Sequence, residues 1–184
     1  MTNTTRLSTT TPEPSDHPIG GVQHTRRVAS VLASKSFATL ATVSESGFPH
    51  SAGVVYVWVE GSMWIHTMRS SRKGRNVAHE PRVAVTVPYR RLPAGPPFTL
   101  HFQARAVLVA MDDPAVRSLV DAGRLKHIAG HGALDEPDGV FVRVTPTATI
   151  HSYGPGARTL DLIRDPLHSG AGSAPAVDVM KMAR

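Results

Sequence analysis

Six segments of the chain have the spacing of β-strands, either alternation of apolar and polar residues or short apolar runs between turns. They run from Phe37 to Val43, Pro49 to Val59, Met63 to Thr67, Arg82 to Val87, Phe98 to Val109, and Gly139 to about Tyr153. Short turns at 44–47 and 60–62 join the first three into an antiparallel meander. We therefore predict a mainly β fold in which six antiparallel strands close into a barrel with a few short helices.

Helical spacing is confined to three short segments. Apolar side chains from Val22 to Ser34 fall on one face of a helix. A second helix is expected near Ser71 to His79, because the residue before Pro81 disfavours helical backbone. Asp113-Pro114 is typical of a helix start, and this third helix is expected to reach about Ile128.

Both ends of the chain and one internal segment lack the composition of a folded core. Residues 1–18 are rich in Thr, Ser and Pro, and residues 166–184 are rich in Ser, Gly and Ala, so both predict flexible tails. A single domain is therefore expected over residues 19–165. The segment from Pro88 to Pro97 contains four prolines and is expected to be a loop, in a position where it could cover a site.

Composition excludes several classes of protein. The 184 residues contain no cysteine, which removes disulfides, thiolate catalysis and cysteine-ligated metals. The longest continuous apolar runs, Val54 to Val59 among them, are far shorter than a membrane span. The first residues lack the hydrophobic region of a secretory signal, so a cytoplasmic protein is expected. Scattered arginines with few aromatic residues do not favour a nucleic-acid partner.

The net charge of +6 arises in one stretch of the chain. Between Arg69 and Arg91 there are seven basic residues and one acid, Glu80, whereas 13 basic and 13 acidic residues balance elsewhere. This stretch begins where a predicted strand gives way to a predicted helix, so its donors lie beside the free N–H groups of a helix start. The arrangement favours an anion site, although on charge alone a solvated basic surface explains the cluster better.

The order of motifs around this stretch resembles the pyridoxamine 5′-phosphate oxidase-like superfamily of FMN-binding split barrels. The resemblance extends from about Phe37 to Val87, with a weaker similarity from Gly139 to Leu160. Its motifs are G-x-P at 47–49, Gly61, a strand ending in His-Thr at 66–67, S-R-K at 71–73, and N-x-x-x-x-P-R-V at 76–83. It implies a split β-barrel that binds FMN and transfers hydride between FMN and a small organic substrate.

The resemblance also implies a set of site residues. By position in the motifs, the residues that contact FMN are His66, Thr67, Ser71, Arg72 and Lys73. The Arg and Lys that the oxidases place against the flavin ring are absent here, so backbone groups are expected to take their place. These belong to Ala52, Gly53, Val54, Val55 and Tyr56. Family members are homodimers with the cofactor in the interface groove, so Tyr153 and Arg158 are expected to reach the ring or substrate from a second subunit.

Departures from the oxidases leave other interpretations open. The C-terminal Arg-x-His substrate motif is absent, so a substrate other than pyridoxamine phosphate is expected. The chain is also similar to actinobacterial split-barrel reductases that use an 8-hydroxy-5-deazaflavin, whose acidic tail would suit the additional arginines. Those arginines are Arg69, Arg75, Arg90 and Arg91. A third interpretation is a non-catalytic module that binds a flavin, haem or nucleic acid through the basic loop.

No metal site is predicted from the sequence. His127 and His131 are four residues apart, but Gly130 and Gly132 interrupt any helix there and no carboxylate at ligand spacing completes a site. No general acid or base stands out either, which is consistent with hydride transfer by a cofactor.

Overall fold

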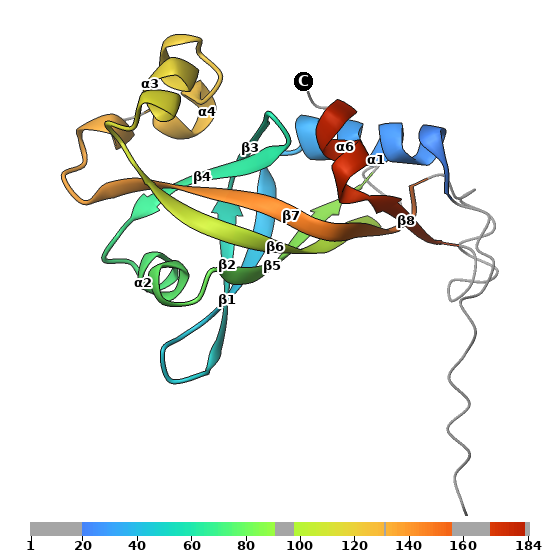
Figure 1. Cartoon of the computed structure of the whole chain (residues 1–184), viewed down its shortest axis with the longest axis horizontal. Coiled ribbons are helices and arrows are strands. Elements are labelled where there is room, and N and C mark those ends of the chain that lie inside the picture. The colour runs from blue at the N-terminus through green and yellow to red at the C-terminus, as the bar shows by residue number, and fades with distance from the viewer. Residues whose placement is uncertain (1–19, 91–97, 131, 156–169, 183–184) are drawn as a thin grey trace, which may run out of the picture.

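Figure 1 shows a curled sheet with short helices around its ends, in a computed structural model that describes residues 20–90, 98–130, 132–155 and 170–182. The strands are β1 (Phe37–Val43), β2 (Pro49–Val55), β3 (Val57–Val59), β4 (Ser62–Met68), β5 (Arg82–Tyr89), β6 (Phe98–Ala110), β7 (Gly139–Tyr153) and β8 (Ala171–Pro175). Their order is β2-β1-β5-β6-β7-β4-β3, all pairs are antiparallel, and β8 pairs with β7 beside this path. The predicted mainly β split barrel is confirmed, with eight strands among the described residues in place of six.

The two edges of this sheet are joined by a single residue, Tyr56. β2 and β3 lie at opposite ends of the strand order, yet only Tyr56 separates them in the sequence, so the sheet has to roll until its edges meet. The single strand predicted over 49–59 is therefore broken at this point. Tyr56 is fully buried, its Oη donates to Leu32 O at 3.0 Å, and its N–H donates to Ser36 O at 2.8 Å. Burial raises the pKa of Tyr56 above its usual value, which keeps the phenol protonated as a donor.

Alternation along the long strands turns one face of the sheet toward the core. Val85 and Val87 of β5 and Leu100 and Phe102 of β6 are buried, while the residues between them are more exposed. The β6–β7 ladder shifts register between Phe102 and Ala104, which marks a bulge. Bulges bend and twist the strand that contains them, so this one helps the long strands wrap around the core.

The helices are short and lie at the ends of the sheet. They are α1 (Val22–Ser34), α2 (Arg72–His79), α3 (Pro114–Asp121) and α4 (Lys126–Ala129), with a 3₁₀ turn η1 (Ala133–Asp135) before β7. The single helix predicted from Pro114 to Ile128 is interrupted, since Gly123 takes a left-handed φ of 67° between α3 and α4. Among the described residues, no helix is long and apolar enough to cross a bilayer.

The C-terminal segment forms regular structure, so the loose tail predicted over residues 166–184 is wrong for the part that the structure describes. β8 extends the sheet along the end of β7, and α6 (Ala176–Met182) follows it directly. α6 lies beside α1 (Figure 1), with Ala176 and Val179 buried. It also approaches the β3–β4 turn so closely that a Cβ on Gly61 would lie 2.8 Å from Met180 Cβ.

Three other expectations concern segments at the limits of the described structure. The loop predicted from Pro88 to Pro97 begins later than expected, because Pro88 and Tyr89 belong to β5, and residues 91–97 lie outside the described residues. The tail predicted over 1–18 also lies outside them. The domain limits 19 and 165 therefore stay a prediction.

The docking of α6 predicts a contrast between two valines on the same helix. Val179→Ala is expected to lower the free energy of unfolding by about 2 kcal/mol, because Val179 is 0% exposed. Val177→Ala, at a position 51% exposed, should change it by less than about 0.5 kcal/mol. Urea titrations followed by circular dichroism measure both values, and equal effects would contradict the docked position of α6.

Candidate cofactor site

The split in the barrel is a cleft between the edge of β2 and strand β4. The cleft has a volume of about 240 Å³ and is lined by Gly53, Val54, Val55, Ile65, His66, Lys73 and Ile128. Five of these residues are among those that the sequence assigned to cofactor binding, namely Gly53, Val54, Val55, His66 and Lys73. The fold therefore brings two strand segments and the first turn of α2 to one place.

The backbone edge of β2 along this cleft is free of strand partners. Among the described residues β2 pairs only with β1, and two bonds flank their ladder: Tyr56 N to Ser36 O, and Ser44 N to Phe48 O. Because bonded pairs alternate in an antiparallel ladder, even-numbered residues of β2 exchange hydrogen bonds with β1 and odd-numbered residues point outward. The outward N–H and C=O groups belong to Ser51, Gly53 and Val55.

This alternation divides the residues of the predicted backbone contacts into two sets, and their role in cofactor binding stays a prediction. The N–H and C=O groups of Ala52 and Val54 face β1, and the N–H of Tyr56 donates to Ser36 O just before β1. The Val54 and Tyr56 side chains lie in the core. Ser51 was not assigned from the sequence, although it shares the outward edge. The turn before β2 and the break after it determine which residues of β2 point their N–H and C=O groups outward. The sequence motif alone did not reveal this.

The junction between β4 and α2 gathers hydrogen-bond donors and positive charge. Ser71 caps α2, since its Oγ accepts a hydrogen bond from Gly74 N at 3.1 Å, and the same Oγ lies 3.1 Å from Thr67 Oγ1. Arg72 and Lys73 occupy the first turn of α2, where Arg72 is exposed and Lys73 lines the cleft. An anion here would meet two cations and the positive end of the helix dipole.

Two polar side chains that the sequence did not single out hold this junction in place. Asn76 is buried in α2, and its Nδ2 donates to Thr42 Oγ1 in β1 at 2.9 Å. Asp138, just before β7, accepts from Ser70 N at 2.9 Å through its carboxylate and from Arg69 N at 2.9 Å through its C=O. Asn76 begins one of the family motifs, which was a usable signal. Asp138 had no local signal, because its partners lie almost seventy residues away.

His66 lies on the cleft wall that faces β2. Its ring meets Phe141 edge-on, with 5.5 Å between the ring centroids. Burial lowers the pKa of His66 below its usual value, against smaller opposing effects of Glu136 and the Ala133 carbonyl. The imidazole is therefore neutral at pH 7, and Lys73 supplies the positive charge of the cleft.

We call the group of Thr67, Ser71, Arg72 and Lys73 at the junction of β4 and α2 the cradle. Of the additional arginines in the basic stretch, Arg75 is the one that the described structure places beside it. It lines a depression of about 600 Å³ together with Arg72 and His79, opposite the β1–β2 turn. Its guanidinium also donates to Ser70 O. Arg72 and Arg75 therefore place positive charge on the α2 side of this depression, while Glu45 of the β1–β2 turn lines its other side.

The other additional arginines lie elsewhere. Arg69 is near Asp138, whose pKa is lowered first by hydrogen bonds from Ser70 and further by the charge of that guanidinium. Arg90 follows β5 at the end away from α2 and lines a different depression, against α1. Arg91 lies outside the described residues. Of the four additional arginines, the described structure therefore places Arg75 beside the cradle and Arg90 away from it.

Tyr153 lies far along β7 from the cleft of its own chain. It ends β7, whereas His66 pairs with Phe141 near the start of that strand. Tyr153 packs against the core cluster and is partly buried. A contact between Tyr153 and the cofactor thus requires a second subunit and stays a prediction. Arg158 and His131 lie outside the described residues.

A rolled antiparallel sheet, open along one edge with a basic helix start beside the opening, defines a split-barrel protein with a candidate anion site. The sequence profile of the pyridoxamine 5′-phosphate oxidase family matches residues 25–152, and the chain belongs to this family. A search of curated proteins by sequence found no significant match.

Solved structures with the same fold have different ligands in their names. A haem-binding protein from Mycobacterium smegmatis aligns with a TM-score of 0.65 and 19% identity, over 85% of this chain but 60% of that protein's length. HutZ, a haem storage protein from Vibrio cholerae, aligns with a TM-score of 0.57 and 18% identity, over 67% of this chain and 89% of HutZ. An FAD-binding protein from Mesorhizobium loti aligns with a TM-score of 0.53 and 18% identity, over 65% of this chain and 84% of that protein. At these identities the similarity establishes the fold alone.

Ser71 is predicted to stabilise both α2 and the cradle. Ser71→Ala should lower the free energy of unfolding by about 1–2 kcal/mol, because Gly74 N and Thr67 Oγ1 each lose a partner. Ser71→Thr keeps a capping hydroxyl and should cost clearly less. Urea titrations of the three proteins provide the comparison. Equal losses for the two variants would argue against the capping role.

Proposed function

We propose that this protein is a flavin-dependent oxidoreductase that binds FMN in the cleft between β2 and β4. The observation that carries the proposal is that two features adjoin. One is the outward backbone edge at Gly53 and Val55, and the other is the charged start of α2. Lys73 lines the cleft between them. The pyrimidine part of a flavin presents N–H and C=O groups that match such an edge. Its phosphate matches such a helix start. The residues present therefore fit both ends of FMN.

The protein's own groups would bind and orient the cofactor. FMN would supply the chemistry, hydride exchange with a small organic substrate. No carboxylate lines the described cleft, and His66 is neutral because burial lowers its pKa. Lys73 therefore places a positive charge in the cleft, which stabilises negative charge on the cofactor.

A second copy of the chain is the proposed partner. Phe37 and Val55 pair across β1 and β2 and are 51% and 50% exposed on the outward face, next to the cleft. The Phe37 ring also lies against Gly53, where an added Cβ would be 3.0 Å from Phe37 Cζ. A copy that covered this apolar pair would narrow the cleft and could bring Tyr153 of the partner subunit toward the ring.

The second candidate cofactor is the 8-hydroxy-5-deazaflavin coenzyme. Its phosphate continues into acidic groups, and the depression lined by Arg72, Arg75 and His79 on the α2 side, with Glu45 on the other side, adjoins the cradle. This depression would take the additional negative charge that FMN lacks.

Cofactor titrations distinguish these candidates. The protein, freed of copurifying small molecules, is titrated with FMN, the deazaflavin coenzyme and haem, with flavin fluorescence and haem absorbance as signals. We expect FMN to bind most tightly, and mass spectrometry of the molecule that copurifies to identify it. Tighter binding of the deazaflavin would select the second candidate. Haem binding without flavin binding would replace both with a haem-binding module.

Arg72 and Lys73 are predicted to hold the phosphate. Arg72→Ala with Lys73→Ala should raise the Kd for FMN at least about tenfold, since each charged hydrogen bond contributes roughly 1.5–3 kcal/mol. Riboflavin, which lacks the phosphate, should bind the variant and the wild type alike. The control pair Arg117→Ala with Lys181→Ala removes the same charge from exposed positions on α3 and α6 and should leave the Kd unchanged. An unchanged Kd for FMN in the first pair would refute the phosphate assignment.

Phe37 is predicted to lie in the contact between two copies. Phe37→Glu should convert a dimer to a monomer in light scattering after gel filtration, because a buried carboxylate without a partner is costly. It should also weaken FMN binding. Val177→Glu, at a position on α6 with the same 51% exposure, should leave both properties unchanged. A Phe37→Glu protein that remains dimeric would remove this face from the interface.

A further inference from the structure

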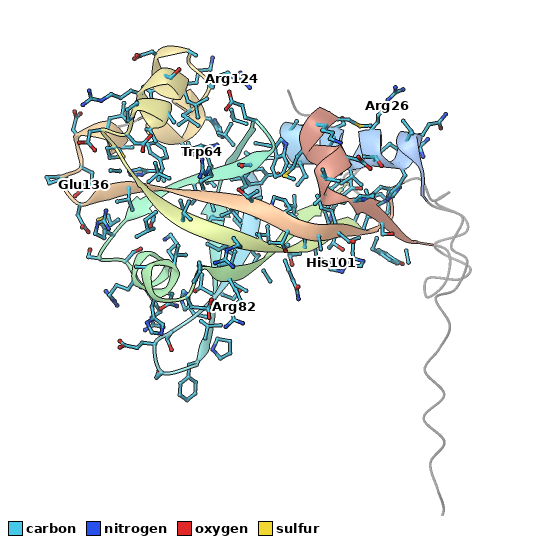
Figure 2. The ribbon with its side chains drawn as sticks, viewed as in Figure 1. Arg26, Trp64, Arg82, His101, Arg124 and Glu136 are labelled. Atoms are coloured by element: carbon cyan, nitrogen blue, oxygen red, sulfur yellow. The ribbon has the colours of Figure 1, made fainter. Side chains whose placement is uncertain are left out.

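A second basic depression lies at the opposite end of the sheet from the cradle. It has a volume of about 490 Å³, and its polar lining includes Arg26, Arg27, Ser30, Ser34, Lys35 and Arg90. Figure 2 shows Arg26 projecting from α1, on the far side of the molecule from α2. This depression shares no lining residue with the cofactor cleft or with the depression beside Arg75.

The lining of this depression consists of donors for anionic oxygens. Four cationic side chains line it, and among the described residues no carboxylate does. Helix α1 contains no Asp or Glu. One guanidinium and two hydroxyls share a face of α1, because Arg27, Ser30 and Ser34 are spaced three and four residues apart. Within the part of the chain that the structure describes, no carboxylate forms an ion pair with Arg26, Arg27 or Lys35.

The shape and the aromatic residue of the depression narrow the class of ligand. Tyr89 is only 9% exposed, and Lys35 Nζ lies 6.0 Å from the centre of its ring, so this ring is no platform for a stacked base. A concave site fits a small molecule better than a duplex. Each phosphate group carries between one and two negative charges at pH 7, so the three cations Arg26, Arg27 and Lys35 match more than one phosphate.

We propose that the depression formed by α1 and the end of β5 binds a small molecule that carries two or more linked phosphate groups. Arg26 and Arg27 hold the phosphates from one side, and Lys35 from the other end of α1. The site is independent of the FMN cleft, and its occupancy does not require the proposed oxidoreductase activity.

His24 provides an internal reporter of this site. It is buried on the inner face of α1, with its Nε2 3.1 Å from Ser152 Oγ in β7. Its pKa is lowered first by burial and further by the charge of Arg27, against a smaller effect of the Pro155 carbonyl. An anion that neutralises Arg27 removes the second of these effects. The pKa of His24 should therefore rise when the depression is occupied.

The probe is tripolyphosphate, titrated by calorimetry into the full-length protein at low salt, where charge attraction is least screened. The cradle is first disabled by Arg72→Gln with Lys73→Gln, so that it does not compete for the probe. We expect this protein to bind tripolyphosphate. Adding Arg26→Gln with Arg27→Gln should raise the Kd at least about tenfold. Adding Arg117→Gln with Lys181→Gln instead should leave the Kd unchanged. The NMR titration of His24 should shift to higher pH in the saturated protein.

Several results would overturn the proposal. If tripolyphosphate no longer binds once Arg72 and Lys73 are replaced, the anion site is the cradle. A Kd insensitive to Arg26→Gln with Arg27→Gln would place the probe elsewhere. Binding of a short DNA duplex without binding of tripolyphosphate would make this face a nucleic-acid surface. Both arginines are exposed, so the variants should fold, and Lys35→Gln gives a second variant that should weaken binding.

Discussion

Closure of the sheet at Tyr56 is the constraint on which the rest of the structure depends. The strands on either side of this residue occupy opposite edges of the sheet, so the backbone has to leave one edge and enter the other within one residue. A buried tyrosine suits this place, because its ring fills the core at the seam while its hydroxyl reaches Leu32 O at the C-terminal end of α1. Helix α1 is thereby connected to the seam of the barrel.

The same closure explains why the barrel is split. The edges meet at Tyr56 and separate along the rest of β2, which leaves the outward backbone groups of Gly53 and Val55 facing a cleft that β4 and α2 complete. Gly74 lets α2 lie close to the end of β4, since a Cβ there would be 2.5 Å from Met68 O. The free edge and the basic helix start are thus two results of one geometry, and in the proposed complex the edge would bind the pyrimidine part of the flavin and the helix start its phosphate.

Positive charge in this protein is divided between two ends of the sheet. α2 carries one group at the opening of the barrel, and α1 with the end of β5 carries the other. In the sequence, Arg90 belongs to the same basic stretch as Arg72. In the structure the full length of β5 separates Arg90 from α2. Basic residues that are close in the sequence therefore lie on different surfaces. A separate anion site at α1 would lie on the helix whose Leu32 carbonyl holds Tyr56.

Sequence alone was sufficient wherever structure depends on near neighbours. The bounds of α1, the long strands and the place of α2 after β4 follow from spacing and from turn chemistry within a few residues. The family motifs also predicted that His66 and Thr67 end a strand and that Lys73 begins a helix, which is where β4 and α2 place them; their contact with a cofactor stays a prediction. Only the tertiary structure decided the features that depend on distant partners. These are the break in the strand at Tyr56, the docking of α6 on α1, the outward direction of the Ser51 backbone groups, and the hydrogen bond from Ser70 N to Asp138. Each of these is set by a contact between segments far apart in the chain, where local spacing carries no information.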